Sequence, residues 1–384
     1  MTAPAIPFNR IHLTGREQLY LAEAIAGSKL SGDGPFTRRC SALLERATGS
    51  AQVLLTHSCT AALEMSALLL DLAPGDEVVM PSFTFVSTAN AMALRGAVPV
   101  FVDVRADTLN IDPDAIEAAI TARTRAIVVV HYAGVGCDLD EILAIARRHG
   151  LAVIEDAAQA IGATRAGRVL GSVGDLGAIS FHDTKNVICG EGGALLVNRT
   201  DLARRAEILR EKGTDRGRFM RGEIDKYTWQ DIGSSFLPSE LLAAFLLAQL
   251  EAMHDITAAR RAAWARYHDA LAPLEVRGLL RRQIVPNDAD PNGHISFVLA
   301  APGIDRDAVL ARLRAEGIAA TFHYVPLHSA PAGRRMGRSH GSMVVTDDAA
   351  ARLIRLPLWV GIGEAEQGRV LDALGRALEA EHRR

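Results

Sequence analysis

Short runs of β-branched and aliphatic residues alternate along the first half of this chain with stretches of helical spacing. Such runs, each bounded by turn residues, predict buried strands. Strands that alternate with helices form a mostly parallel sheet covered on both faces, so this pattern predicts an α/β fold. The predicted strands are 53–55, 78–80, 98–102, 126–130, 152–155, 178–181 and 194–197, and the clearest helices between them are 61–70, 113–120 and 138–149.

The last two predicted strands are joined differently from the others. The segment between them is short and rich in glycine and polar residues. A crossover between parallel strands needs about a dozen residues or more and is usually a helix. We therefore expect the strands at 178–181 and 194–197 to be antiparallel, in a mixed but mostly parallel sheet of seven strands.

The second half of the chain predicts a smaller domain. Chains of 384 residues usually divide, and Pro273 with the loop-like segment 286–291 favours a boundary. We expect a large domain over 1–250 and a smaller α+β domain over 251–384. The elements expected there are a continuous helix over 239–272, strands at 295–300 and 319–323 around a helix at 305–316, and helices at 349–354 and 364–378.

Composition excludes several classes of protein. The 42 basic and 45 acidic side chains give a net charge of −3, without the basic excess of nucleic-acid binding, so we expect no nucleic-acid partner. No apolar run reaches the roughly 18 residues of a membrane span, and the first residues lack the pattern of a secretory signal. We expect a cytoplasmic protein without membrane contact. The four cysteines have no CxxC spacing, which favours buried thiols over a metal site.

Small, aromatic and acidic residues follow three of the predicted strands, at the edge where open α/β sheets bind ligands. Residues 58–61 begin a helix whose free N–H groups suit a phosphate. Phe85 follows the next strand and offers a flat ring for stacking. Asp156 ends an apolar strand, where a buried carboxylate needs a partner. An ordinary helix cap and core packing are the alternative explanations for the first two features.

One of the four lysines follows a predicted strand at the same edge. Lys185 comes after the strand at 178–181, whereas Lys29, Lys212 and Lys226 lie in segments typical of solvated surface. A phosphate cradle, a stacking ring, an acid for a pyridinium nitrogen and a lysine able to form a Schiff base together predict a pyridoxal phosphate site.

His131 and Tyr132 also follow a predicted strand. A lone histidine at such a position is as often structural as functional, so both roles stay open.

At these residues the chain resembles the sugar-nucleotide aminotransferases of the DegT/StrS family. These enzymes have the aspartate aminotransferase-like fold, fold type I of the PLP-dependent enzymes, with a large α/β domain and a smaller C-terminal α+β domain. The resemblance runs over nearly the whole chain. The matching segments are 58–63, 81–85, 128–131, 155–159, 180–186 and 190–193.

The resemblance implies a role for each residue at its matching position. It implies that Lys185 holds the cofactor, pyridoxal 5'-phosphate, covalently and that Asp156 contacts its pyridine nitrogen, both residues being catalytic. The other cofactor contacts that it implies are Gln159 near the ring oxygen, Phe85 stacked on the ring, and Thr60, Ala61 and Ser180 at the phosphate.

Two segments depart from the common family pattern. Ser58-Cys59 stands where many members have Asn-Gly, at the phosphate turn. Ser235 stands where many members have an asparagine that reaches the cofactor phosphate in the partner subunit. The resemblance implies a homodimer whose sites are shared between chains. Because Ser235 is short, Tyr227 and Trp229 of the same stretch are further candidates for contacts at the shared site.

The function implied by the resemblance is transfer of an amino group from L-glutamate to a nucleotide-linked ketosugar. The segments 29–34, 36–40, 86–90 and 226–235 narrow this expectation to a dTDP-4-keto-6-deoxyhexose and a product of galacto configuration. The candidate substrate contacts are His131, Tyr132, Tyr227, Trp229, Tyr324 and His328, although the segment with Tyr324 and His328 fits a strand end with a proline turn equally well.

Other functions fit the same cofactor motifs. One is amination of a different ketosugar, at C3 or at C4 in the gluco configuration. Another is a non-catalytic PLP-binding regulator. A related dehydratase branch has histidine in place of the lysine, and Lys185 argues against it.

Overall fold

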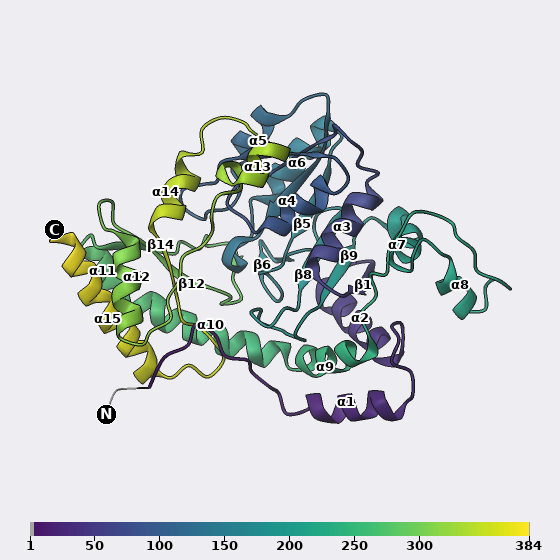
Figure 1. Cartoon of the computed structure of the whole chain (residues 1–384), viewed down its shortest axis with the longest axis horizontal. Helices are drawn as coiled ribbons and strands as arrows, with labels where there is room; N and C mark the ends of the chain where they lie inside the picture. Colours follow the sequence, from purple (N-terminus) through teal and green to yellow (C-terminus); the bar gives the residue numbers. More distant parts are fainter. Residues whose placement is uncertain (1–3, 384) are drawn as a thin grey trace.

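The alternating apolar runs form one mixed sheet in the computed structural model, which describes residues 4–383 (Figure 1). Neighbouring strands are parallel except β9, which is antiparallel to both β1 and β8. Across the sheet the order is β1 (Gln52–Thr56), β9 (Gly193–Val197), β8 (Leu176–Ser180), β5 (Ala152–Asp156), β4 (Thr124–Val130), β2 (Glu77–Pro81), β3 (Val98–Val102) and β13 (Arg338–Ser339).

The strand pairing confirms the predicted antiparallel pair, but the predicted number of strands is wrong. β8 and β9 pair antiparallel along their full length. Within residues 4–383 the sheet has eight strands rather than seven. The additional strand, β13, has only two residues and pairs with β3. A run of two residues carries no periodic signal, and an ion pair holds it in place, since Arg338 Nη2 lies 2.7 Å from the Glu77 carboxylate.

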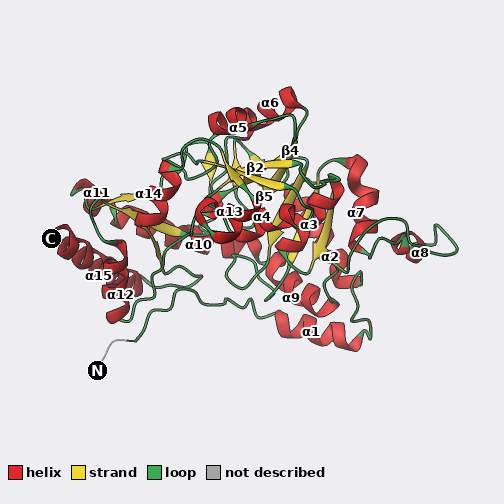
Figure 2. Ribbon diagram, turned by 45° about the horizontal axis from the view of Figure 1, so that its top comes forward, coloured by secondary structure: helices red, strands yellow, loops and turns green. Residues whose placement is uncertain are grey.

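Helices cover both faces of the sheet, as the alternating pattern predicts (Figure 2). Alternate residues of each strand enter opposite cores: Val53 and Leu55 face one core and Leu54 the other. The first core contains residues of α1 (Glu17–Ala26), α2 (Pro35–Thr48), α5 (Pro113–Ala119), α6 (Leu139–His149) and α9 (Glu240–Glu251), and the second contains residues of α3 (Cys59–Leu69), α4 (Val86–Ala93) and α7 (Ala203–Arg210).

The long helix predicted over 239–272 is broken, which corrects that prediction. α9 ends at Glu251, and α10 (Met253–Ala270) starts after Ala252 at an angle of 62°. Because of the bend, the two helices contribute to different hydrophobic cores. Leu247 of α9 packs under the large sheet, and Tyr267 of α10 packs in a separate cluster. Among residues 4–383 no single helix is long and apolar enough to cross a membrane, and only the bent run from α9 to Val276 reaches that length and apolarity jointly.

The C-terminal part contains a second, antiparallel sheet. Its strands are β10 (Leu280–Arg282), β12 (Ser296–Ala300) and β14 (Leu353–Leu356), and α12 (Arg306–Ala315) and α15 (Glu364–His382) pack on it. Two predictions are wrong here. Residues 319–323 form no strand, only a bridge from Thr321 to Arg355. The helix predicted at 349–354 is the end of α14 (Val344–Arg352), and Leu353 and Ile354 instead begin β14, where the sheet buries them.

The first described residues run along the C-terminal part before they reach α1 (Figure 1). Ile6 pairs with Ile318 and is buried in the same cluster as Tyr267. The division of the chain at residue 250 stays a prediction. The remaining elements are η1 (Tyr132–Gly134), β6 (Thr164–Arg165), β7 (Arg168–Val169), η2 (Thr200–Leu202), α8 (Arg216–Met220), α11 (Ala272–Val276), β11 (Ala289–Asp290), η3 (Leu327–Ser329) and α13 (Pro331–Met336).

Candidate active site

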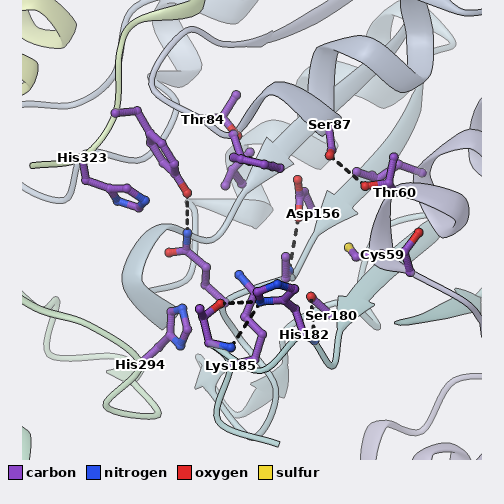
Figure 3. Close-up of a pocket in the computed structure, with 18 of the residues that line it drawn as sticks. Cys59, Thr60, Thr84, Ser87, Asp156, Ser180, His182, Lys185, His294 and His323 are labelled. Carbon is purple, nitrogen blue, oxygen red and sulfur yellow. Dashed lines mark hydrogen bonds between the residues drawn. The ribbon is translucent and has the colours of Figure 1, made fainter. Parts of the chain in front are cut away.

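A cavity of about 440 Å³ opens where the parallel strands of the large sheet end (Figure 3). Its walls come from the segments that follow β1, β2, β5 and β8, and from the C-terminal part. This is the edge at which open α/β sheets bind ligands. The polar and aromatic residues that line it are Ser58, Cys59, Thr60, Thr84, Phe85, Ser87, Asp156, Gln159, Ser180, His182, Thr184, Lys185, Glu191, His294, His323, Tyr324, Arg355 and Phe8.

The N-terminus of α3 forms one side of the cavity. The Ser58 side chain caps the helix by accepting a hydrogen bond from the N–H of Ala61 at 3.1 Å. Among the described residues the N–H groups of Cys59 and Thr60 have no acceptor, so the ordinary Ser58 cap leaves two N–H groups free. The Thr60 hydroxyl lies 2.8 Å from that of Ser87. Two free N–H groups, several hydroxyls and the helix dipole suit a phosphate.

Close packing beneath this turn depends on a glycine. A Cβ at Gly193, the first residue of β9, would lie 2.4 Å from the Cys59 nitrogen. A side chain here would therefore displace the start of α3 and with it the free N–H groups.

Asp156 ends β5 and is 5% exposed. Thr88 donates to one carboxylate oxygen at 2.7 Å, and the N–H of Ala158 donates to the other at 3.2 Å. Burial raises the pKa of Asp156, and these two hydrogen bonds and the charge of Lys185 oppose that rise. The carboxylate is thus held in a fixed orientation in the wall of the cavity, where a cationic ligand would stabilise it.

Lys185 lies in the turn that follows β8, and its N–H donates to the carbonyl of His182 at 2.9 Å. Among the described residues its amine has no hydrogen bond or ion pair, and no other lysine lines the cavity. Burial lowers the pKa of Lys185, while Cys59 and Asp156 act in the opposite direction. A lowered pKa makes the neutral, nucleophilic amine more accessible near pH 7.

Gln159 and Phe85 are two further residues that the sequence predicts at the cavity. The Gln159 side chain accepts from the N–H of Ala133 at 2.7 Å and donates to the Tyr324 hydroxyl at 2.7 Å. Phe85 is 57% exposed at the cavity edge, which leaves its ring free to cover a planar ligand. Thr60, Ser180 and Tyr324 also line the cavity, whereas Ala61 lies behind it with its N–H bonded to the cap.

His131 and Tyr132 lie behind the cavity wall and do not line it. Nδ1 of His131 accepts from the N–H of Cys137 at 3.2 Å, so its ring proton lies on Nε2, 2.8 Å from Glu155. The Tyr132 hydroxyl lies 3.0 Å from His323. The turn at η1 folds both residues into the core, where they support the residues of the wall.

The other predicted contacts lie outside this chain's cavity. Ser235 is exposed and pairs with Glu211, and Trp229 is 81% exposed. Tyr227 and Trp229 follow α8 on an arm that projects from the body of the molecule (Figure 1). His328 is hydrogen-bonded to Ser82 at 2.8 Å. Of the four cysteines, Cys40, Cys137 and Cys189 are buried thiols, but Cys59 lines the cavity.

The C-terminal part contributes Tyr324, which the sequence analysis named, and three residues that it missed, namely His294, His323 and Arg355. For Arg355 a signal existed, because it is the one charged residue of the apolar strand β14. Burial lowers the pKa of both histidines well below the usual range, so they are neutral at pH 7.

The chain is similar to known aminotransferases along almost its whole length. The model of the DegT/DnrJ/EryC1/StrS aminotransferase family matches residues 12–375. The solved structure of aminotransferase TlmJ from Streptoalloteichus hindustanus is 32% identical, covers 99% of this chain and 99% of its own, and has a TM-score of 0.88. A family member from Brucella abortus is 31% identical over 94% of each chain with a TM-score of 0.85. DesV from S. venezuelae is 31% identical over 98% of this chain and 99% of its own, also with a TM-score of 0.88.

Proposed function

This chain belongs to the DegT/DnrJ/EryC1/StrS aminotransferase family, and from that premise we propose that it transfers an amino group from L-glutamate to a nucleotide-linked ketosugar. The chain is a PLP-dependent enzyme, and its fold is that of the fold type I aminotransferases. The observation that carries the proposal is the cavity, which brings Lys185, Asp156 and the free N-terminus of α3 together at one edge of the sheet.

The residues of the cavity fit pyridoxal phosphate. The free N–H groups of α3 with Thr60 and Ser180 would hold the phosphate, and Asp156 would face the ring nitrogen. Lys185 would bind covalently to the carbonyl carbon of the cofactor, and the side chain of Phe85 would cover the cofactor ring. When bound, this cofactor supplies an electron sink for the bond being broken at the donor carbon.

The protein's own contribution is to hold and move protons at fixed atoms. The carboxylate of Asp156 would keep a proton on the ring nitrogen, because a cation there would stabilise its buried charge. The amine of Lys185 would, when not bound to the cofactor, lie beside the reacting carbon and move the proton there. The buried position of both groups strengthens these interactions.

Within this class we infer a dTDP-4-keto-6-deoxyhexose as the ketone and dTDP-4-amino-4,6-dideoxygalactose as the product. The support is the likeness of residues 29–34, 36–40, 86–90 and 226–235 to the dTDP-4-amino-4,6-dideoxygalactose transaminase of enterobacterial common antigen synthesis. That enzyme also has a Ser-Ser pair at the position of Ser234 and Ser235. Amination at C3, or at C4 in the gluco configuration, is the competing assignment.

We also infer a homodimer in which the arm around Tyr227 and Trp229 completes the site of the other copy. The support is that this arm projects from the body and exposes its aromatic side chains, while lining no part of its own chain's cavity.

An amine-transfer assay tests the proposed function. The yellow enzyme should lose its colour with L-glutamate and regain it with the correct ketone, in ping-pong kinetics. A panel of dTDP-linked 4-keto and 3-keto sugars identifies the ketone, and NMR determines the configuration at C4. An equatorial amine at C4 would refute the galacto product while leaving the aminotransferase class intact.

A further inference from the structure

A second cavity, of about 390 Å³, lies outside the active site, beside the edge strand β1 of the large sheet. Its walls come from the loop before α2, from α2, from the first residues of β1, from the end of α7 and from α8 (Figure 1). It shares no lining residue with the cavity that contains Lys185. A cavity of this volume is large enough for a small ligand, and its polar residues indicate which ligand chemistry it suits.

Three cations of the second cavity converge on Asp33. Arg210 Nη2 lies 2.6 Å from the Asp33 carboxylate. Lys29 and Arg38 both donate to the Asp33 carbonyl, at 3.0 and 2.9 Å. Within residues 4–383 neither Lys29 nor Arg38 forms an ion pair. One carboxylate therefore faces three cations, and two of these have no counter-charge.

The other carboxylates of the second cavity already have partners. Glu207 lies 3.0 Å from Arg221, and Glu211 lies 2.9 Å from Arg216. Glu45 accepts a hydrogen bond from a backbone N–H of β1 at 3.1 Å. These groups are thus not available to neutralise the cations around Asp33, and an anionic ligand would do so.

Three buried polar atoms in the side chains that line this cavity have no partner among the described residues. Arg210 is 6% exposed, and its Nε has no acceptor. Glu211 is also 6% exposed, and its Oε2 has no donor. Oε1 of Gln52 has no donor either, although Nε2 of the same side chain donates to Glu207 at 2.9 Å. Such atoms are rare because each destabilises the fold, and a rotamer change on binding is enough to bring one to a ligand.

The unpaired groups call for a ligand with two kinds of chemistry. Lys29, Arg38 and Nε of Arg210 are donors, and the first two are unpaired charges, which suits a phosphate. The unpaired oxygens of Gln52 and Glu211 are acceptors, which suits hydroxyl groups. Inorganic phosphate matches only the first set and a free sugar only the second. A sugar that carries a phosphate matches both.

The second cavity also lies at the base of the arm that carries Tyr227 and Trp229. The helix α8, which supplies part of the cavity wall, begins this arm (Figure 1). Glu211, another lining residue, pairs with Ser235 at the far end of the same stretch. A ligand bonded to both α2 and α8 would connect the base of the arm to the body of the molecule.

We propose that the second cavity binds a sugar phosphate and that the bound ligand fixes the base of the arm. The site itself does not depend on the proposed aminotransferase function. Only its effect on the active site of the other copy rests on the homodimer inferred above.

Calorimetric titration of the PLP-loaded enzyme with α-D-glucose 1-phosphate tests the site. This probe has a phosphate and hydroxyl groups but no free carbonyl, so it is not a substrate for amine transfer. Inorganic phosphate should bind more weakly than the probe, and methyl α-D-glucoside should not bind. AMP is the nucleotide probe, and tighter binding of AMP in the same cavity would identify the sugar as a ribose rather than a hexose.

Variants of the lining residues locate the bound probe. Lys29→Gln and Arg38→Gln each remove an unpaired cation and should raise the Kd for glucose 1-phosphate on the order of 10-fold. Gln52→Leu removes an acceptor and should weaken glucose 1-phosphate while leaving inorganic phosphate unchanged. Arg46→Gln, which removes an exposed charge of α2 outside the cavity, is the matched control and should bind like the wild type.

Limited digestion with trypsin measures the effect on the arm. Lys226 lies on the arm and does not line the second cavity. Glucose 1-phosphate should slow cleavage after Lys226 severalfold in the wild type and in Arg46→Gln, but not in Arg38→Gln. Unchanged cleavage with the probe bound would contradict the part of the proposal that concerns the arm.

Two further results would overturn the site. Equal binding of glucose 1-phosphate by the wild type, Lys29→Gln and Arg38→Gln would show that the probe binds elsewhere. Absence of binding, with a weaker dimer in both charge variants, would show that a second copy of the chain covers the cavity. Failure of the proposed function is separate, because it appears as a wild type that keeps its yellow colour with L-glutamate while still binding glucose 1-phosphate.

Discussion

Lys185 and Asp156 line one cavity, but we predict that their replacement affects cofactor binding and turnover differently. Lys185→Ala removes the amine that binds the cofactor and moves the proton, so turnover should fall below detection. Asp156→Asn keeps the shape but removes the charge that holds the ring proton, so it should retain cofactor and lose at least about 100-fold in kcat. Single-turnover kinetics measure the loss of rate in each variant, and cofactor absorbance measures whether the cofactor is retained. Near wild-type rates in either variant would contradict its role, and lost stability with unchanged chemistry in Asp156→Asn would assign it a structural one.

At the scale of the element, Glu77 joins β2 to the short strand β13. Its carboxylate, 1% exposed, accepts from Arg338 at 2.7 and 3.0 Å and from Arg123 at 2.6 Å. These bonds, with Arg338 first, lower its pKa from 4.5 to about 2. A folded pKa below the unfolded one stabilises the fold fully above pH 4.5, and this is lost as the pH falls toward 2.

Glu77→Gln is therefore expected to lower the free energy of unfolding by about 3 kcal/mol at pH 7. The difference from the wild type should narrow as the pH is lowered below 4.5. Urea unfolding at several pH values measures this. Glu117→Gln, which removes an exposed carboxylate paired with Arg148, is the matched control and should change stability far less than Glu77→Gln does, because solvent screens an exposed pair. A difference between Glu77→Gln and wild type that is constant from pH 7 to pH 3 would show that the carboxylate's charge is not responsible.

At the scale of the whole molecule, the prediction concerns the shared site of the homodimer. Lys185→Ala and a Tyr227→Ala/Trp229→Ala double variant should each be inactive alone. Co-expressed, they should recover up to about a quarter of the sites, because each mixed dimer has one site with an intact lysine and an intact arm. Lys185→Ala co-expressed with Asp156→Asn is the control and should recover nothing, since both residues line the cavity of one chain. An active monomer, or equal recovery in both mixtures, would contradict the shared site.

The sequence predicts most of the large sheet, its antiparallel β8–β9 pair and the convergence of Asp156 and Lys185 at one edge. Local patterns suffice for these features, because burial follows side-chain periodicity and the carboxyl ends of parallel strands meet at the same edge. Two other features depend on tertiary packing. His131 is enclosed against Glu155, and the helix predicted over 239–272 bends at Ala252 and so packs in two cores.

The contacts between the C-terminal part and the rest of the molecule do not follow from the sequence pattern. Arg355 reaches the cavity because β14 pairs with β12 and with Thr321. The strand β13 joins the large sheet because Arg338 forms an ion pair with the buried Glu77. Such contacts join segments far apart in the chain, and they depend on packing and charge pairing between helices and strands that have already formed. Periodicity reports only whether a residue is buried, not which distant residue it meets there.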